Sequence, residues 1–109
     1  MISQIVKGEF KMLDFLTLSN ISNKTIDAIL KNNTQSKIGD LSFNDKDCIK
    51  IIEYMRQIGF KCIDDLLINY LNVFIMDYDD FVKKISKLNI PYFVQCVNDD
   101  ISSIEFIYN

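Results

Sequence analysis

The chain has 109 residues, of which 49% are hydrophobic and 25% are charged, a balance typical of a single folded domain spanning residues 1–109. Its net charge of −3 argues against nucleic-acid binding, which draws its affinity from basic surfaces. No histidine is present and the three cysteines lack CxxC spacing, which excludes the usual zinc sites and Ser–His or Cys–His catalysis. We therefore expect a protein that is not an enzyme and that holds no metal or cofactor.

The sequence has no pattern typical of membrane insertion or export. No stretch approaches the roughly 20 apolar residues of a membrane span, and the first residues lack the basic flank and long apolar run of a signal peptide. We expect a cytoplasmic protein without a membrane partner, in which Cys48, Cys62 and Cys96 are small buried thiols. Lysine outnumbers arginine eleven to one, which is typical of an AT-rich genome such as that of a low-GC bacterium or its phages.

The first expected unit, residues 9–32, is a pair of helices. An apolar stripe at helical spacing predicts the first helix. Asn20, which tolerates left-handed backbone, is followed by the apolar Ile21, and this combination predicts a helix stop. A second helix is predicted over residues 25–33. The polar stretch 31–40 is predicted to be a flexible loop and a candidate binding site.

The second expected unit, residues 44–70, has the same organisation. Its first helix is predicted to be capped by Asn44. Phe43 before the cap and Cys48 after it have the spacing of a hydrophobic staple, which sets the angle at which the chain enters the helix. Gly59 followed by an apolar residue predicts the stop, and a second helix follows at once.

The rest of the chain repeats this pattern once and then ends in a tail. Residues 70–78 are almost wholly apolar and form a short buried helix or a strand, and their place between helices favours the helix. The third unit, residues 77–98, starts at the predicted cap Asp77 and has its predicted stop at Asn89. Residues 99–109 are predicted to be a last helix that caps the core.

These features predict an all-α fold of about six to seven helices. The similar starts at residues 42–52 and 75–85 indicate a repeated helical hairpin. Hairpins of this size must stack to bury their apolar faces, as in a short solenoid. The alternative is an irregular helical bundle that uses the same capping residues repeatedly.

Within residues 51–90, the stretch QIGFKCIDDLL has a glycine and an aromatic residue between two predicted helices, and NYLNVFI is an apolar run after the second helix. This stretch resembles the helical repeat of the mitochondrial transcription termination factor (mTERF) family, which has a leucine–glycine–aromatic stop between its helices and an apolar run after the second. Members of that family pair helices into a solenoid whose basic concave face holds duplex nucleic acid. The resemblance therefore implies stacked hairpins and, as an alternative function, nucleic-acid binding.

Aspartates gather at the predicted helix starts. The spaced carboxylates of Asp77, Asp79 and Asp80 are ligands of the kind that calcium prefers, but the stretch lacks the glycine and glutamate of a calcium-binding loop. Capping and the helix dipole explain these residues better, and they explain Asp64 and Asp65 in the same way. An acidic face built from such starts would steer the chain onto a basic partner.

Tyrosines and lysines provide two further candidate contacts. Tyr78 and Tyr108 are predicted to be exposed contacts, because tyrosine combines apolar area with a hydroxyl and is enriched at protein interfaces. Lys83, Lys84 and Lys87 would lie on one side of a helix. They form either a solvated helix face or a contact with phosphate.

We expect a small acidic protein–protein interaction module, such as an inhibitor, an immunity-type protein or a regulatory protein, that binds a basic partner. The predicted partner-binding residues are Asp64, Asp65, Asp77, Tyr78, Asp79 and Tyr108. The alternative is an mTERF-like nucleic-acid-binding repeat protein that uses Lys83, Lys84 and Lys87. An enzyme would need a thiol or paired aspartates, and no neighbouring motif activates either. Homo-oligomerisation is compatible with every alternative, because a short solenoid has apolar ends.

Overall fold

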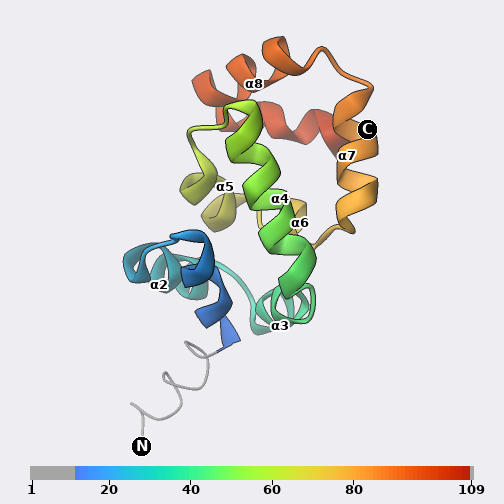
Figure 1. The fold of residues 1–109 in the computed structure, drawn as a ribbon. Coiled ribbons are helices and arrows are strands. Elements are labelled where there is room, and N and C mark those ends of the chain that lie inside the picture. Colours follow the sequence, from blue (N-terminus) through green and yellow to red (C-terminus); the bar gives the residue numbers. More distant parts are fainter. Residues whose placement is uncertain (1–11, 109) are drawn as a thin grey trace, which may run out of the picture.

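The computed structural model describes residues 12–108, and every regular element within them is an α-helix or a 3₁₀ helix (η) (Figure 1). The all-α prediction is confirmed, although the described residues form nine helices rather than six or seven. In chain order they are η1 (Asp14–Ser19), α2 (Asn23–Asn32), α3 (Gln35–Phe43), α4 (Asp45–Ile58), α5 (Ile63–Asn69), α6 (Asn72–Ile75), α7 (Tyr78–Ser86), α8 (Ile90–Asp99) and η2 (Ile101–Tyr108). No helix in this part of the chain is long and apolar enough to span a membrane. The predicted beginning of the first unit, residues 9–11, lies outside the described residues.

The polar loop predicted between the first two units is wrong, because a helix stands in its place. α3 begins after Thr34, whose hydroxyl oxygen accepts a hydrogen bond from the Lys37 N–H at 3.2 Å. Ile38 and Leu41, three residues apart on one helix face, are both buried. The cap and this apolar pair stabilise a helix that the polar composition of the stretch had concealed.

Two of the three predicted helix stops are confirmed. Gly59 ends α4 with a φ of 107°, and its N–H donates to the Met55 carbonyl at 3.1 Å. Asn20 ends η1 in the same left-handed region, with a φ of 63°. The predicted stop at Asn89 is wrong, because its φ is −72° and its side-chain oxygen accepts from the Tyr92 N–H at 3.2 Å. It begins α8 instead, and the proline in the first turn of α8 favours this role because it has no N–H to satisfy.

The two similar helix starts are built in different ways. Asp77 caps α7 as predicted, because its carboxylate accepts a hydrogen bond from the Asp79 N–H at 2.8 Å. The predicted cap Asn44 is wrong: its side-chain amide donates instead to the carbonyls of Phe74 and Met76, at 3.1 and 2.9 Å. Asn44 also ends α3, and its φ of −100° and ψ of 26° are not the extended values from which a cap reaches the first turn.

The hydrophobic staple predicted between Phe43 and Cys48 is also wrong. Phe43 is 95% exposed, whereas Cys48 is fully buried. Because α3 runs to Phe43 and α4 begins only two residues later, the ring lies at the junction of two helices and does not fold back onto α4. In the corresponding pair at α7, Met76 is half-buried and Phe81 is fully buried.

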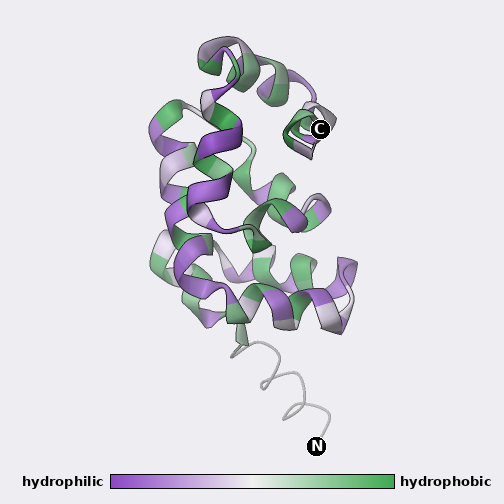
Figure 2. Cartoon of the chain, turned by 90° about the vertical axis from the view of Figure 1, so that its right-hand side faces the viewer, coloured by the Kyte–Doolittle hydropathy of each residue, from purple (hydrophilic) through white to green (hydrophobic). Residues whose placement is uncertain are grey.

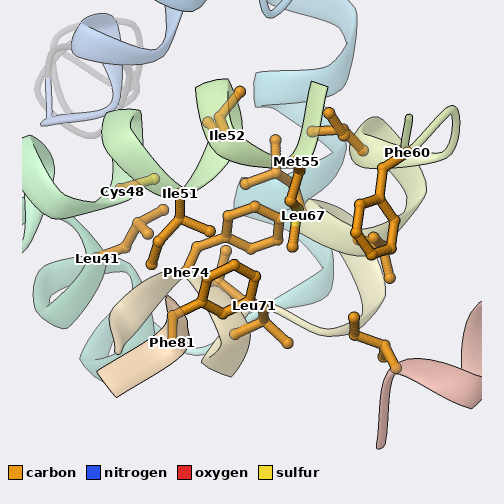
Figure 3. Close-up of a cluster of buried hydrophobic side chains, with 14 of the residues drawn as sticks. Leu41, Cys48, Ile51, Ile52, Met55, Phe60, Leu67, Leu71, Phe74 and Phe81 are labelled. Carbon is orange, nitrogen blue, oxygen red and sulfur yellow. The ribbon is translucent and has the colours of Figure 1, made fainter. Parts of the chain in front are cut away.

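α4 is the central helix of the core. Its inward face presents Ile51 and Met55 to the rings of Phe74 on α6 and Phe81 on α7, and these four side chains are fully buried (Figure 3). Ile52 is also fully buried but points away from these two rings. α6 confirms that the apolar segment after the second unit is a short helix and not a strand. Hydrophilic and hydrophobic residues interleave along most helices (Figure 2), so each helix can turn an apolar face to this core.

Side-chain amides join helices that are far apart in the sequence. Asn32 and Asn33, at the end of α2, both donate to the Ile68 carbonyl of α5, at 2.8 and 3.2 Å. Asn98 of α8 donates to the Gly59 carbonyl at 3.1 Å, in the turn between α4 and α5. These bonds satisfy backbone carbonyls at helix ends, where no intrahelical partner exists.

The tail forms the last helix that the sequence predicts. Asp100 starts η2, because its carboxylate accepts hydrogen bonds from the N–H and the hydroxyl of Ser102, at 3.1 and 2.8 Å. Ile104 and Ile107 are buried where η2 packs on α8 and α7.

Candidate functional site

The fold places the starts of α4 and α7 side by side. The Tyr78 N–H, at the start of α7, donates to the Asp47 carboxylate in the first turn of α4, at 3.0 Å. The bonds from Asn44 to the segment before α7 hold the same two starts together. The aspartates of these two adjoining helix starts form a group that we call the acidic edge. Its members are Asp45, Asp47, Asp77, Asp79 and Asp80.

The acidic edge has little internal neutralisation. Within residues 12–108 the one ion pair joins Lys31 to Asp27 on α2, so none of the five carboxylates is paired there. Lys46, in the first turn of α4, offsets part of the charge. Carboxylates at helix N-termini are stabilised by the helix dipole, which allows several of them to gather without lysine partners. The resulting negative potential attracts cationic groups.

A hollow of about 400 Å³ lies beside the acidic edge, between α4 and α7, and we call it the α4–α7 hollow. Two tyrosines form an aromatic wall: the rings of Tyr54 and Tyr78 meet edge to face, with centroids 6.3 Å apart. Tyr54 meets the buried Phe81 ring in the same way, at 6.1 Å, and this contact anchors the wall to the core. The residues that line the hollow are Lys50, Glu53, Tyr54, Gln57, Tyr78 and Asp79.

One cation already lies on the aromatic wall. The Lys50 ammonium is 5.8 Å from the centroid of the Tyr78 ring, close to the outer limit of about 6 Å for a cation–π contact. Lys50 is exposed, so its flexible side chain can also turn into water. The hollow contains this single positive charge against the carboxylates of Glu53 and Asp79, and its net charge is therefore negative.

Asp64 and Asp65, which the sequence also predicts as partner-binding residues, do not join the acidic edge. They lie in the first turn of α5, and α5 and α7 flank α4 on opposite sides (Figure 1). The Asp64 carboxylate accepts a hydrogen bond from the Thr25 hydroxyl of α2 at 3.3 Å. Asp64 therefore joins two helices, although both Asp64 and Asp65 are exposed.

Tyr108 and three lysines are exposed but do not line the hollow. Tyr108, at the end of η2, is 45% exposed, and partial burial together with the nearby Glu105 carboxylate raises its pKa. Lys83 and Lys84 are exposed in the last turn of α7, and the exposed Lys87 follows them. α7 thus has an acidic start and a basic end, an arrangement that complements its dipole.

Two further recesses were not predicted from the sequence. One, of about 190 Å³, lies between α8 and η2, where Tyr92 and Phe106 are 69% and 63% exposed. The other, of about 350 Å³, lies between η1 and α4, beside Leu18. Each recess is formed by residues of two helices, so no local motif indicates it.

Sequence reasoning identified one half of the site, the start of α7. Asp77, Tyr78 and Asp79 were predicted contacts, and all three lie at the acidic edge or in the hollow. Glu53 and Tyr54 were missed, because they belong to the site only where α4 packs beside α7. The similarity of the two helix starts was the available signal, since a repeated pattern suggests that equivalent ends lie together.

Burial makes two of the thiols poor nucleophiles. Burial, assisted by the nearby Asp45 carboxylate, raises the pKa of Cys48 far above its ordinary value. The pKa of Cys62 is also raised, chiefly by burial. All three cysteines are free, and the predicted burial is confirmed for Cys48, whereas Cys62 and Cys96 are half-buried.

The described residues contain no group of three or more side chains placed to hold a metal ion.

No protein-family model matches the chain, and comparisons with characterised proteins and with solved structures give no significant match. The resemblance of residues 51–90 to the mTERF repeat therefore stays a prediction. The function of the site has to be inferred from its own geometry and charge.

Proposed function

We propose that this chain is a small interaction module that holds a basic surface of a partner protein against the acidic edge. One observation supports this proposal above others: two adjoining helix starts carry five aspartates, beside a hollow with a tyrosine wall. Negative charge steers a basic partner toward the edge, and tyrosines supply the contact area that protein interfaces favour. An inhibitor, an immunity-type protein or a regulatory protein of the cytoplasm acts in this way, by covering its partner's surface.

The architecture proposed for this role is a single domain of stacked helical hairpins, formed by residues 9–32, 44–70 and 77–98. The hydrogen bond from the Asn98 side-chain amide to the turn between α4 and α5 supports the contact between the second and third hairpins. The bonds between the end of α2 and α5 support the contact between the first and second. Apolar ends of such a stack are compatible with homo-oligomers.

Nucleic-acid binding, the alternative function, has weaker support. Lys83, Lys84 and Lys87 are exposed and close together, as a phosphate contact requires. The same helix, however, begins in the acidic edge, which repels phosphate. Retention on DNA or RNA that is strong at low ionic strength and falls with added salt would favour this alternative.

Affinity capture with matched variants tests the proposal. The tagged protein is incubated with an extract of its native cells, with and without nuclease, and captured proteins are identified by mass spectrometry. We expect a basic protein, present in stoichiometric amounts, that survives nuclease treatment and is lost with Asp79→Asn/Asp80→Asn. The control, Asp14→Asn/Asp99→Asn, removes the same charge from exposed positions outside the acidic edge and should retain the partner.

Two results would contradict the proposal. Equal loss of the partner with both double variants would mean that only net charge matters and that the acidic edge has no special role. Loss of all captured material after nuclease treatment would support the nucleic-acid alternative.

A further inference from the structure

We infer, on the basis of the proposed function, that the α4–α7 hollow takes an arginine side chain from the partner protein. Three features of the hollow point to this side chain. They are the preformed aromatic wall, the displaceable lysine that lies on it, and the free acceptor groups around it.

The aromatic wall is ordered before any partner binds. The ring of Tyr54 lies at 84° to that of Tyr78 and at 90° to that of the fully buried Phe81. The backbone of Tyr78 is fixed in addition by the hydrogen bond from its N–H to Asp47. A surface that is already ordered loses less conformational entropy on binding, so it favours a partner that matches its shape.

Lys50 indicates that the Tyr78 ring accepts a cation. Its ammonium lies near the ring but at long range, 5.8 Å from the centroid, on an exposed side chain. A guanidinium is flat and less strongly hydrated than an ammonium, so it stacks on a tyrosine ring better than Lys50 does. An arriving arginine would therefore displace Lys50 into water and take its place on the ring.

Acceptor oxygens surround the wall. Glu53 and Gln57 on α4 and Asp79 on α7 line the hollow, and none of these side chains has a hydrogen-bond partner among residues 12–108. A guanidinium carries five N–H donors in one plane, so it can stack on Tyr78 and bond to carboxylates at the same time. A volume of about 400 Å³ has room for one such side chain and several waters, each of which takes about 30 Å³.

The other two recesses lack this combination. The recess between α8 and η2 has no charged side chain in its lining. The recess between η1 and α4 has two lysines, Lys46 and Lys50, against the single carboxylate of Asp45. Among these recesses, only the α4–α7 hollow has a net negative charge beside a tyrosine wall.

NMR titration of the whole protein with two peptides tests the inference. The probes are hexa-arginine and hexa-lysine, which carry the same charge on different side chains. We expect hexa-arginine to bind more tightly, by up to about fivefold, because a guanidinium stacks on tyrosine better than an ammonium does. The largest shift changes should occur at Tyr54, Tyr78 and Asp79. Equal affinities, or shift changes centred on Asp64 and Asp65, would overturn the inference.

Two substitutions separate the hollow from general charge attraction. Tyr78→Leu removes the ring but keeps an apolar side chain, and it should weaken hexa-arginine binding by up to about fivefold and hexa-lysine binding less. Lys50→Met removes the internal competitor at an exposed position, and it should strengthen hexa-arginine binding more than hexa-lysine binding. General charge attraction alone predicts an equal gain for the two peptides. A purely structural role for these residues predicts no gain from Lys50→Met. Unchanged affinity in both variants would overturn the inference.

The proposed function and the arginine site can fail separately. A basic partner that depends on Asp79 and Asp80, together with unchanged peptide binding in both variants, would leave the acidic edge as the binding surface and overturn the arginine site. Selective hexa-arginine binding at the hollow, without any captured basic protein, would support the arginine site and contradict the proposed function.

Discussion

The starts of α4 and α7 share a residue pattern but use their first polar side chain differently. At α7, Asp77 accepts a hydrogen bond from the Asp79 N–H of its own helix. At α4, Asn44 donates to the carbonyls of Phe74 and Met76, which belong to a distant segment. A carboxylate only accepts hydrogen bonds, whereas an amide also donates them. A capping pattern therefore indicates where a helix begins, but the chemistry of the cap residue decides whether it stays local or joins two parts of the fold.

The largest effect is expected at the fourth helical position, which holds Phe81 in α7 and Cys48 in α4. Phe81 is fully buried against Tyr54, so Phe81→Ala should lower the free energy of unfolding by about 3–5 kcal/mol. Urea denaturation measures this loss. Phe43→Ala removes the same atoms from a ring that is 95% exposed, and it should change stability by less than about 0.5 kcal/mol. Similar losses in the two variants would contradict the core described above.

Substituting the residues that precede α4 and α7, Asn44 and Asp77, tests the comparison directly. Asn44→Asp replaces an amide donor with a carboxylate that cannot bond to the carbonyls of Phe74 and Met76, so we expect a loss of about 1–3 kcal/mol. Asp77→Asn keeps an acceptor for the Asp79 N–H and should cost only a few tenths of a kcal/mol, about the difference between good cap residues. Equal costs in urea denaturation would mean that both residues act as local caps.

Cys48 and Phe81, the residues at the fourth helical position of α4 and α7, should also differ in how they make stability depend on pH. Burial raises the pKa of Cys48 above its ordinary value of 9.0, so the folded chain keeps this proton at a pH where the unfolded chain has lost it. The stability that the thiol contributes is complete below pH 9.0 and declines as the pH rises toward the folded-state pKa. The decline is at most about 1.4 kcal/mol per pH unit.

Urea unfolding of the wild type and of Cys48→Ala at a series of pH values above neutrality measures this decline. Once the pH exceeds 9.0, the free energy of unfolding should fall more steeply with pH for the wild type than for Cys48→Ala. Phe81 has no titratable group and contributes no such dependence. Cys62 and Tyr108, whose pKa values are also raised, contribute equally to both proteins and cancel in the difference. Parallel curves would contradict the burial of the Cys48 thiol.

Local backbone chemistry explains which parts of the fold could be predicted. Gly59 and Asn20 were recognised as stops because tolerance of left-handed backbone is a property of the residue itself. Asn89 has the same tolerance but also caps well, and the proline that follows it favours the second role. α3 was missed because its signal, Thr34 with two spaced apolar residues, is short and surrounded by polar residues.

The candidate site was predictable only in its local part. Tyr78 and Asp79 stand in a recognisable helix start, so the sequence indicated them. Glu53 and Tyr54 acquire a role through the packing of α4 beside α7, which depends on contacts such as the bond from Tyr78 to Asp47. Such contacts join segments that no local pattern connects, and they can be identified only from the folded chain.

A smaller effect than that of Phe81→Ala or Asn44→Asp is expected when the local cap of α7 is removed. Asp77→Ala removes the acceptor of the Asp79 N–H and should cost about 1 kcal/mol, because water can satisfy that N–H at an exposed helix start. Amide exchange should become faster at Asp79 and stay unchanged in α4. A cost as large as that of Asn44→Asp would mean that the cap acts beyond its own turn.

Comparing Asp77→Ala with Asp77→Asn also separates two roles of this residue, which are to cap α7 and to contribute negative charge to the acidic edge. Asparagine keeps the hydrogen bond to the first turn but removes the charge, whereas alanine removes both. A loss of partner binding that is equal in the two variants would come from the charge, because the cap is intact in one of them. A loss confined to Asp77→Ala would show that the partner requires the ordered helix start, and the carboxylate of Asp77 would then contribute to stability but not to recognition.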